Sequence, residues 1–183
     1  AQGAGDGQGA VHRLARAGES HVERGVARGE GPGRRVAETL ADERQNGGGR
    51  DVACRAVESK RDVLKAIAEV GDSGRKISEL HFVGHAGMYG PMFGTVAFPE
   101  QFSPYEWENL DIPFAENASA SFHCCRSARW FAPFFARTFN VKANGYFWYT
   151  TFSRSKHRYS SAGDNTERPL YTIGCKGRKS HGY

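Results

Sequence analysis

Two apolar runs decide the fold of this chain: Ile77–Gly84, which reads ISELHFVG, and Ala118–His123, which reads ASASFH. Short apolar runs bounded by glycine or polar residues are typical of the buried strands of a parallel sheet. His85 follows the first run directly, and the pair Cys124 and Cys125 follows the second. In an open α/β sheet, chemistry lies just beyond the carboxyl ends of the strands. The pattern therefore predicts a thiol nucleophile at one edge of the sheet, with a histidine as its base.

The uneven distribution of apolar residues predicts where the domain begins. The chain has 183 residues, of which 39% are hydrophobic, below the usual level of about 45–50%. Residues 1–50 contain no Phe, Tyr, Trp, Ile or Met, and every aromatic residue follows position 81. We therefore expect 1–50 to be a poorly ordered, Gly/Ala/Arg-rich linker or pro-segment. Residues 51–183 are then one domain, and the initial Ala suggests a piece of a larger protein.

Other expected elements follow from periodicity and turn residues. An amphipathic helix is expected over 51–70, because its apolar residues recur at three- and four-residue steps. Ser59 and Asp62 can form a capping box within it, and Gly71 can end it. The remaining expectations are an extended piece over 92–98, a helical turn over 104–110, a helix over about 128–139 capped by Ser127, a strand over 146–152 and a weaker strand over 170–173. This order predicts a parallel α/β fold.

The net charge of +5 lies in the C-terminal part of the chain, where residues 153–183 carry seven Lys and Arg against Asp164 and Glu167. The ordinary interpretation is a solvated basic tail. The alternative is a surface that binds a polyanion, a phosphorylated ligand or an acidic substrate segment. We do not expect a nucleic-acid partner, because no such motif is present and aromatic residues are sparse in this segment.

Four cysteines in a chain of this length, two of them adjacent, do not form a disulfide framework. No signal peptide is recognisable, and no apolar run approaches the length of a membrane span. These features predict a cytoplasmic location without membrane association.

Cys125 is the predicted nucleophile. A thiol attacks as thiolate and needs a base or a positive field, which His85, Arg126 and the amino-terminal end of the helix after position 127 can supply. Backbone amides at Ala86 and Gly87 can form an oxyanion hole. Cys124 is the alternative nucleophile.

A metal site formed by the histidines and cysteines at the two strand ends is the weaker interpretation. Successive strand residues point to opposite faces, and no C-x-x-C spacing is present. The residues concerned are His85, His123, Cys124 and Cys125. We expect no metal and no cofactor, and we interpret His81 and His123 as core or supporting groups.

The segment LHFVGHAG (80–87), followed by SFHCCRS (121–127), resembles the caspase-like cysteine peptidases. These include caspases, legumains, gingipains, bacterial CHAT domains and the self-processing peptidases of RTX toxins. Their shared pattern is a strand that ends in His-Gly and a later strand that ends in a small residue and then Cys. The resemblance covers roughly residues 52–153. It is strongest to the CHAT domains and next to the toxin domains.

The resemblance implies a caspase-like three-layer fold and a cysteine endopeptidase that cleaves a polypeptide, or itself, with a His85/Cys125 dyad. It also implies that Ser153 and Arg154 help to shape the substrate pocket. Ala86 stands where the family usually has Gly. The family's early strands have no candidate in 1–50, so we expect a truncated sheet, or one completed by a partner protein or a missing segment. Two alternatives stay open: an inactive binding or signalling module, and a toxin-type peptidase activated by a polyanion.

Overall fold

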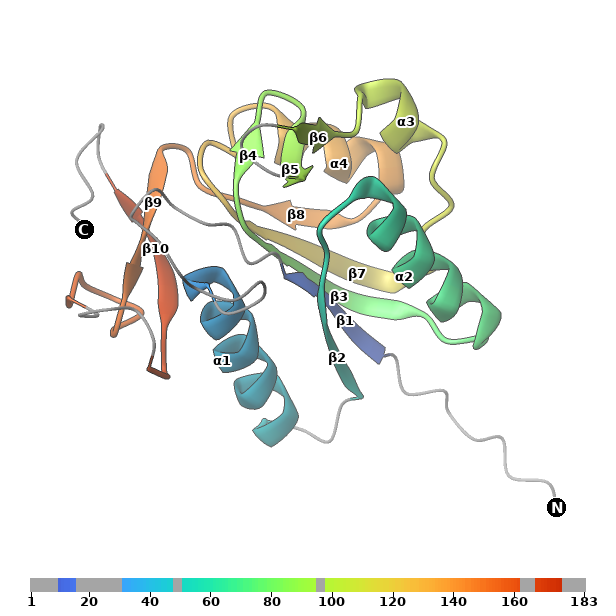
Figure 1. Cartoon of the computed structure of the whole chain (residues 1–183). Coiled ribbons are helices and arrows are strands. Elements are labelled where there is room, and N and C mark those ends of the chain that lie inside the picture. The colour runs from blue at the N-terminus through green and yellow to red at the C-terminus, as the bar shows by residue number, and fades with distance from the viewer. Residues whose placement is uncertain (1–9, 16–30, 48–50, 95–97, 162–166, 176–183) are drawn as a thin grey trace, which may run out of the picture.

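A five-stranded sheet forms the centre of the molecule, in a computed structural model that describes residues 10–15, 31–47, 51–94, 98–161 and 167–175. The strand order is β2-β1-β3-β7-β8, and every neighbouring pair is parallel (Figure 1). The expectation of an α/β fold around a mostly parallel sheet is confirmed. The strands are β1 (Ala10–Ala15), β2 (Val52–Ala56), β3 (Ile77–Val83), β7 (Phe114–His123) and β8 (Lys142–Asn144).

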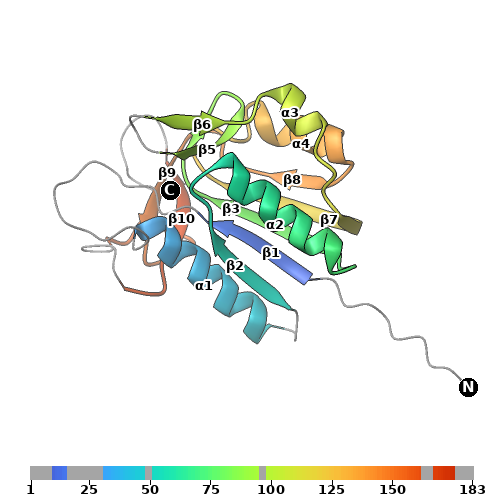
Figure 2. The same cartoon turned by 45° about the vertical axis from the view of Figure 1, so that its right-hand side comes forward.

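The expected absence of structure in residues 1–50 is wrong for two segments. β1 lies inside the sheet and pairs with β2 on one side and β3 on the other (Figure 2). Helix α1 (Pro32–Asn46) follows it and buries Val36 and Ala37 completely. Pairing of β1 requires backbone hydrogen bonds on both sides, and α1 needs only small apolar residues on one face, so neither needs aromatic residues. The expectation that residues 1–50 hold no candidate for a strand of the sheet is therefore wrong.

The single helix expected over 51–70 is instead a strand followed by a helix. β2 takes its first part, and α2 (Lys60–Asp72) takes the second. The capping box of Ser59 and Asp62 is confirmed, and it begins the helix rather than lying inside one. A capped amino terminus at Ser59 fixes where the helix can start, which leaves the preceding residues free to pair with β1.

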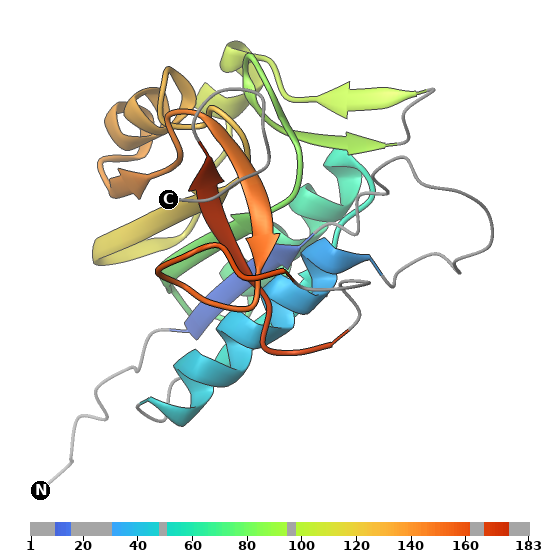
Figure 3. The same cartoon turned by 90° about the vertical axis from the view of Figure 1, so that its left-hand side faces the viewer.

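The two faces of the sheet carry different layers. Leu80 and Phe82 of β3 belong to the aromatic core under α2 and α4 (Phe131–Phe139), whereas Val83 packs with Val36 and Leu170 on the side of α1. Figures 1 and 3 show α1 on one side of the sheet and α2 and α4 on the other. The alternation of strand side chains produces this division.

The strand expected over 146–152 does not join the main sheet. It forms as β9 (Tyr149–Ser153), which pairs antiparallel with β10 (Tyr171–Cys175) in a separate two-stranded sheet. The place beside β7 is taken by β8. The β9–β10 hairpin lies beside α1, beyond the carboxyl ends of the main strands (Figures 1 and 3). It is therefore positioned to contact whatever follows β7.

A small antiparallel sheet forms the upper rim of the molecule in Figure 1. It consists of β4 (Ala86–Gly87), β5 (Gly90–Gly94) and β6 (Pro99–Gln101), and it leads into the short helix α3 (Pro104–Glu108). The expected helical turn over 104–110 is confirmed by α3, and part of the expected extended piece over 92–98 is confirmed by β5. Both β4 and β5 follow His85, so this small sheet fixes the path of the chain after β3.

Helix α4 begins later than expected and is not capped by Ser127. Its N-cap is Trp130, without a side-chain cap, and the hydroxyl of Ser127 instead donates to the carbonyls of Phe122 and Cys124. The amide of Tyr146 in turn donates to that hydroxyl (3.1 Å). Ser127 is buried, so its hydroxyl has to be satisfied within the protein. It therefore secures the turn after β7 rather than the start of a helix.

Candidate active site

His85 and Cys125 follow the carboxyl ends of two neighbouring strands, at the same edge of the sheet. β3 and β7 are neighbours, with Val83 paired to His123 at their carboxyl ends. The amide of Gly84 also donates to the carbonyl of His123 (3.4 Å). His85 lies two residues after Val83, and Cys125 lies two residues after His123. Both candidate residues therefore follow the same paired position of two adjacent parallel strands.

Cys125 is partly accessible and contacts β9. The amide of Thr150 donates to its Sγ at 3.3 Å, and the Thr150 hydroxyl lies 3.4 Å from the same sulfur. Thr150 has no role in the sequence prediction. Nothing in the local sequence could have identified it, because its contact with Cys125 depends on where the hairpin lies. A thiol of intermediate exposure with donors directed at the sulfur can act as a nucleophile.

Cys124 has the opposite environment. Its side chain is fully buried in the aromatic core, and burial raises the pKa of the Cys124 thiol to about 12. Successive residues at the end of β7 point to opposite faces, which separates two otherwise equivalent thiols. Of the two adjacent cysteines, only Cys125 is accessible to solvent.

The turn between β7 and α4 is tightly built. Arg126 has a φ of 56°, in the left-handed region that residues other than glycine rarely adopt. Its amide donates to the carbonyl of Trp148 (2.7 Å), and the amide of Ala128 donates to that of Tyr146 (3.1 Å). A Cβ at Gly145 would lie 2.5 Å from the Ser127 hydroxyl, so only glycine fits there. These contacts hold Cys125 against the segment that leads into β9.

The segment after His85 is a tight hairpin. Ala86 and Gly87 form β4, which pairs with Pro91 and Gly90 of β5. A Cβ at Gly90 would lie 2.4 Å from the Phe131 ring, and the φ of Gly90 is +104°. Glycine at this position lets the hairpin pack on the start of α4. The predicted oxyanion residues therefore lie in an ordered hairpin that packs against the helix after Cys125, and His85 itself is exposed.

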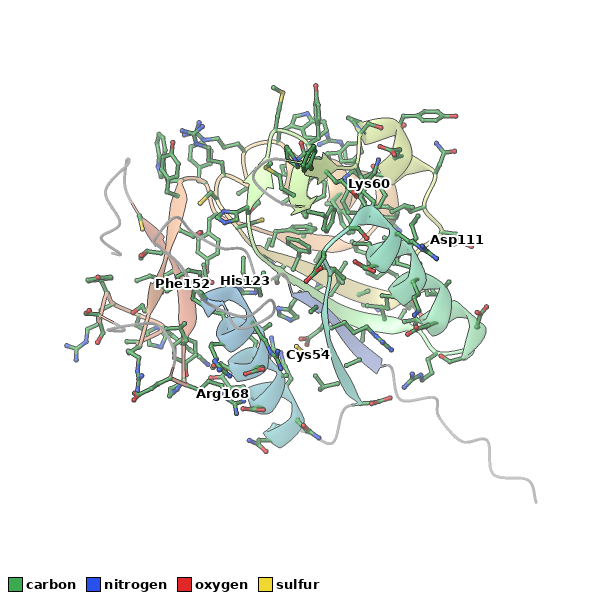
Figure 4. The ribbon with its side chains drawn as sticks, viewed as in Figure 1. Cys54, Lys60, Asp111, His123, Phe152 and Arg168 are labelled. Carbon is green, nitrogen blue, oxygen red and sulfur yellow. The ribbon has the colours of Figure 1, made fainter. Side chains whose placement is uncertain are left out.

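His81 and His123 form a polar connection on the sheet face opposite the aromatic core. His81 Nδ1 lies 3.1 Å from His123 Nε2, and its Nε2 lies 3.3 Å from a carboxylate oxygen of Glu79. Arg44 of α1 pairs with the same oxygen at 2.8 Å. Figure 4 shows His123 between the sheet and the start of α1. Because His81 is buried, its ring nitrogens need these partners, and the connection joins α1 to the end of β7.

Ser153 does not fit the predicted role in a substrate pocket. Its side chain is fully buried, and its hydroxyl donates to the carbonyl of Arg158 and accepts from the amides of Ser155 and Ser160. It organises the loop after β9 and has no exposed atom for a ligand. Arg154 is partly exposed and pairs with Glu167 at 2.9 Å.

Part of the basic C-terminal segment is neutralised by α1. Lys156 pairs with Glu43 at 2.8 Å, and Arg168 pairs with Asp42 at 2.7 Å. These cations hold the β9–β10 region to α1, so within 153–161 and 167–175 much of the basic charge is already paired. Lys176, Arg178 and Lys179, the remaining candidates for a polyanion site, lie outside the described residues.

The described residues contain neither a metal site nor a membrane-spanning helix, and the hollow found among them lies away from Cys125. No group of three or more metal-ligating side chains occurs among the described residues. No described helix is long and apolar enough to cross a bilayer. A hollow of about 340 Å³ lies beside Cys54 and is lined by residues of β2 and α2 such as Lys65 and Glu69. It shares no residue with the edge that carries Cys125, because β1 and β3 separate β2 from β7.

A search of protein-family models finds none that matches the chain, and no curated protein and no solved structure matches it either.

Proposed function

We propose that the protein is a cysteine endopeptidase of the caspase-like kind, with Cys125 as nucleophile and His85 as general base and acid. The observation that carries the proposal is the register of β3 and β7, which pairs Val83 with His123. Two residues further on, each strand yields one member of a thiol–imidazole pair, at the edge where ligands bind in open parallel sheets. The sequence motif 80–87 supports the same assignment.

The proposed reaction is acyl transfer. His85 accepts the thiol proton, and the Cys125 sulfur attacks the carbonyl carbon of a peptide bond. The C–N bond then breaks, and His85 returns the proton to the leaving amine. Water, deprotonated by the same imidazole, hydrolyses the thioester and regenerates the thiol. Amides of Ala86, Gly87 and Cys125 are the proposed donors to the oxyanion.

The choice of Cys125 rests on burial. Cys124 is enclosed by the aromatic core, and its raised pKa leaves it almost fully protonated near neutral pH. Cys125 is exposed in part and is contacted by donors of Thr150. A nucleophile has to reach both solvent and substrate, so the two adjacent cysteines make a matched pair for mutagenesis.

The test compares Cys125→Ala, His85→Ala, the double variant and Cys124→Ala. With fluorescein-labelled casein as substrate, each of the first two is expected to lower the rate by about a thousandfold or more, and the double variant no further, because nucleophile and base act together. Cys124→Ala should retain turnover. Loss of activity in Cys124→Ala with full activity in Cys125→Ala would refute the assignment. Circular dichroism establishes that each variant is folded.

The inactive-module alternative makes a different prediction in the same set. The wild-type chain would then leave casein intact, and an electrophilic peptide probe would label Cys125 no faster than free cysteine.

The polyanion-activated alternative predicts that labelling accelerates when inositol hexakisphosphate is added, and that this acceleration disappears when Lys176, Arg178 and Lys179 are changed to Ser.

A further inference from the structure

Aromatic and arginine side chains gather on the surface next to Cys125, and none of them forms a bond to the substrate or transfers a proton in the proposed chemistry. They come from the β4–β5 hairpin, from the turn after β7, and from the first residue of β9 with the two residues before it. We name these residues the aromatic–arginine surface: Met88, Tyr89, Arg126, Arg129, Trp130, Phe147, Trp148 and Tyr149. Phe147 is 59% exposed and Trp148 is 44% exposed. Large exposed rings in one place are typical of interaction sites.

The arrangement of these side chains is fixed before any partner binds. Arg129 lies over the Trp148 ring at 4.3 Å and donates from Nε to the carbonyl of Phe147 at 2.9 Å. Arg126 lies over the Tyr149 ring at 4.5 Å and donates to its hydroxyl. Side chains that are already ordered lose less conformational entropy on binding.

The two guanidinium groups carry charge that nothing in the described protein neutralises. Arg34, Arg44, Arg154 and Arg168 all pair with carboxylates. In the described part of the chain, Arg126 and Arg129 make only contacts to rings, a hydroxyl and backbone carbonyls. Each retains donors for an anionic group. The surface therefore combines apolar area with two unneutralised positive charges.

The surface borders the nucleophile directly. Arg126 is the residue after Cys125, and the Thr150 amide that reaches the Cys125 sulfur follows Tyr149 in the chain. Tyr89 packs edge-on against Trp130, with ring centroids 5.8 Å apart. The β4–β5 hairpin thus extends the surface to the side of the site that carries His85. A chain bound at the proposed active site would therefore lie next to these residues.

We propose that this surface selects the substrate: a polypeptide segment in which acidic side chains lie within a few residues of bulky apolar side chains. This proposal rests on the proposed function for its catalytic meaning. Carboxylates pair with Arg126 and Arg129, and the apolar side chains cover Trp130, Phe147 and Met88. Aromatic and arginine residues are the ones that contribute most at binding sites.

A single-stranded nucleic acid is the other polymer that aromatic and basic side chains can bind. It requires free ring faces for base stacking. Arg129 already lies over Phe147 and Trp148, and Trp130 stacks on Phe134 with an interplanar angle of 11°. One face of each of these three rings is therefore already occupied, while the guanidinium donors remain for a ligand. This geometry favours peptide side chains over bases.

Binding is tested in the Cys125→Ala protein, so that the result does not depend on cleavage. Fluorescence anisotropy is measured with labelled ten-residue peptides that contain Asp-Leu-Phe-Asp, Asn-Leu-Phe-Asn or Asp-Ser-Ser-Asp at their centre, and with a labelled oligo-dT. The first peptide is expected to bind at least about fivefold more tightly than either of the other two. Its affinity should fall as salt rises, because the charges are exposed.

Variants of the same protein assign the site. Changing Arg126 and Arg129 together to Gln is expected to weaken the acidic peptide about fivefold and to leave the Asn peptide unchanged. Phe147→Ala should weaken the binding of both peptides with the Leu-Phe core by about tenfold. Arg137→Gln removes the same charge at the far end of α4 and serves as the matched control, with no expected effect.

Equal affinity for the acidic and neutral peptides overturns the proposal, as does an equal effect of Arg137→Gln. Binding of oligo-dT without binding of the acidic peptide also overturns it, and assigns the surface to single-stranded nucleic acid. If binding behaves as expected but casein is never cleaved, the proposed peptidase function fails while the docking surface stands. If casein is cleaved and the peptides bind equally, only the substrate preference fails.

Discussion

Cys124 and Cys125 are neighbours in sequence, but their thiols have different chemistry. Residues at the end of β7 alternate between the aromatic core and the opposite face, so Phe122 and Cys124 are buried while Cys125 contacts Thr150. Reactivity of a thiol follows its accessibility and its fraction of thiolate.

Alkylation by iodoacetamide is therefore expected to separate the cysteines of the native protein. Cys125 and the exposed Cys54 should be labelled near neutral pH, whereas Cys124 and the buried Cys175 should react only after the protein is unfolded in urea. Peptide mass spectrometry locates the labels. Native labelling of Cys124 at the rate of Cys125 would contradict the burial described for it.

The buried thiol of Cys124 also links stability to pH. Because its pKa is about 12 in the folded protein against an ordinary 9.0, its contribution is full below about pH 9 and declines as pH rises toward 12. The slope is at most about 1.4 kcal/mol per pH unit for one proton. The measurement is the free energy of unfolding in urea between pH 8 and 11, for wild type and Cys124→Ala.

Wild type should lose stability more steeply than Cys124→Ala over that range. Tyr171, whose pKa burial raises first of all, titrates in both proteins and cancels in the comparison. The pKa of Tyr146 is raised first by burial and then by the charge of Cys124, so its change belongs to the measured effect of Cys124→Ala. Parallel curves would mean that Cys124 is ionised as easily in the folded state as in the unfolded state.

Helix α1 shows how an element can be stabilised without aromatic residues. Its buried face consists of Gly33, Val36, Ala37 and Thr39. Thr39 donates its hydroxyl to the Arg35 carbonyl (2.8 Å) and accepts from the buried amide of Leu170 (3.0 Å). This one hydroxyl joins α1 to the residue that precedes β10.

Thr39→Val is expected to destabilise the protein by about 1–3 kcal/mol, because it keeps the shape of the side chain but leaves the Leu170 amide unsatisfied. Thr39→Ser, which retains the hydroxyl, should restore most of that loss. Urea denaturation measures both. If Val and Ser cost the same, packing and not the hydrogen bond holds α1 to the hairpin.

At the scale of the whole molecule, the sheet depends on the strand nearest the amino terminus. β1 pairs with both β2 and β3, so its removal would leave β2 without a neighbouring strand and would open one edge of β3, which keeps only β7 as a partner. Unpaired backbone groups in a sheet interior are costly. The fold therefore depends on a strand that composition alone had placed in a linker.

Deleting residues 1–30 is expected to abolish cooperative unfolding, whereas deleting residues 1–9, which retains β1, should leave it intact. Amides between Ala10 and Ala15 should also be protected from hydrogen exchange to about the level of β3, because they lie between two paired strands. Measuring exchange by mass spectrometry in the intact chain avoids the question of whether a truncated protein folds. Rapid exchange throughout 10–15 would contradict the central position of β1.

The candidate site was predictable where it depends on local order. Strand 77–83 and the residue that follows it can be recognised from one short stretch of sequence, and so can the end of β7 at His123. The capping box at Ser59 is equally local, because its two side chains are three residues apart. These signals were sufficient to predict a parallel α/β fold and to name His85 and the cysteine pair.

The sequence by itself thus determined that the runs ending at Gly84 and His123 are buried strands, and which side chains follow them. Only the tertiary structure decided which strands are neighbours, with β1 between β2 and β3, and β8 rather than β9 beside β7. It also decided that Thr150 lies at the Cys125 sulfur. It also decided which cysteine is buried and that Ser153 is enclosed. The reason is physical. Strand pairing and burial are set by backbone hydrogen bonds and packing between residues far apart in the chain, whereas periodicity and capping act over a few residues.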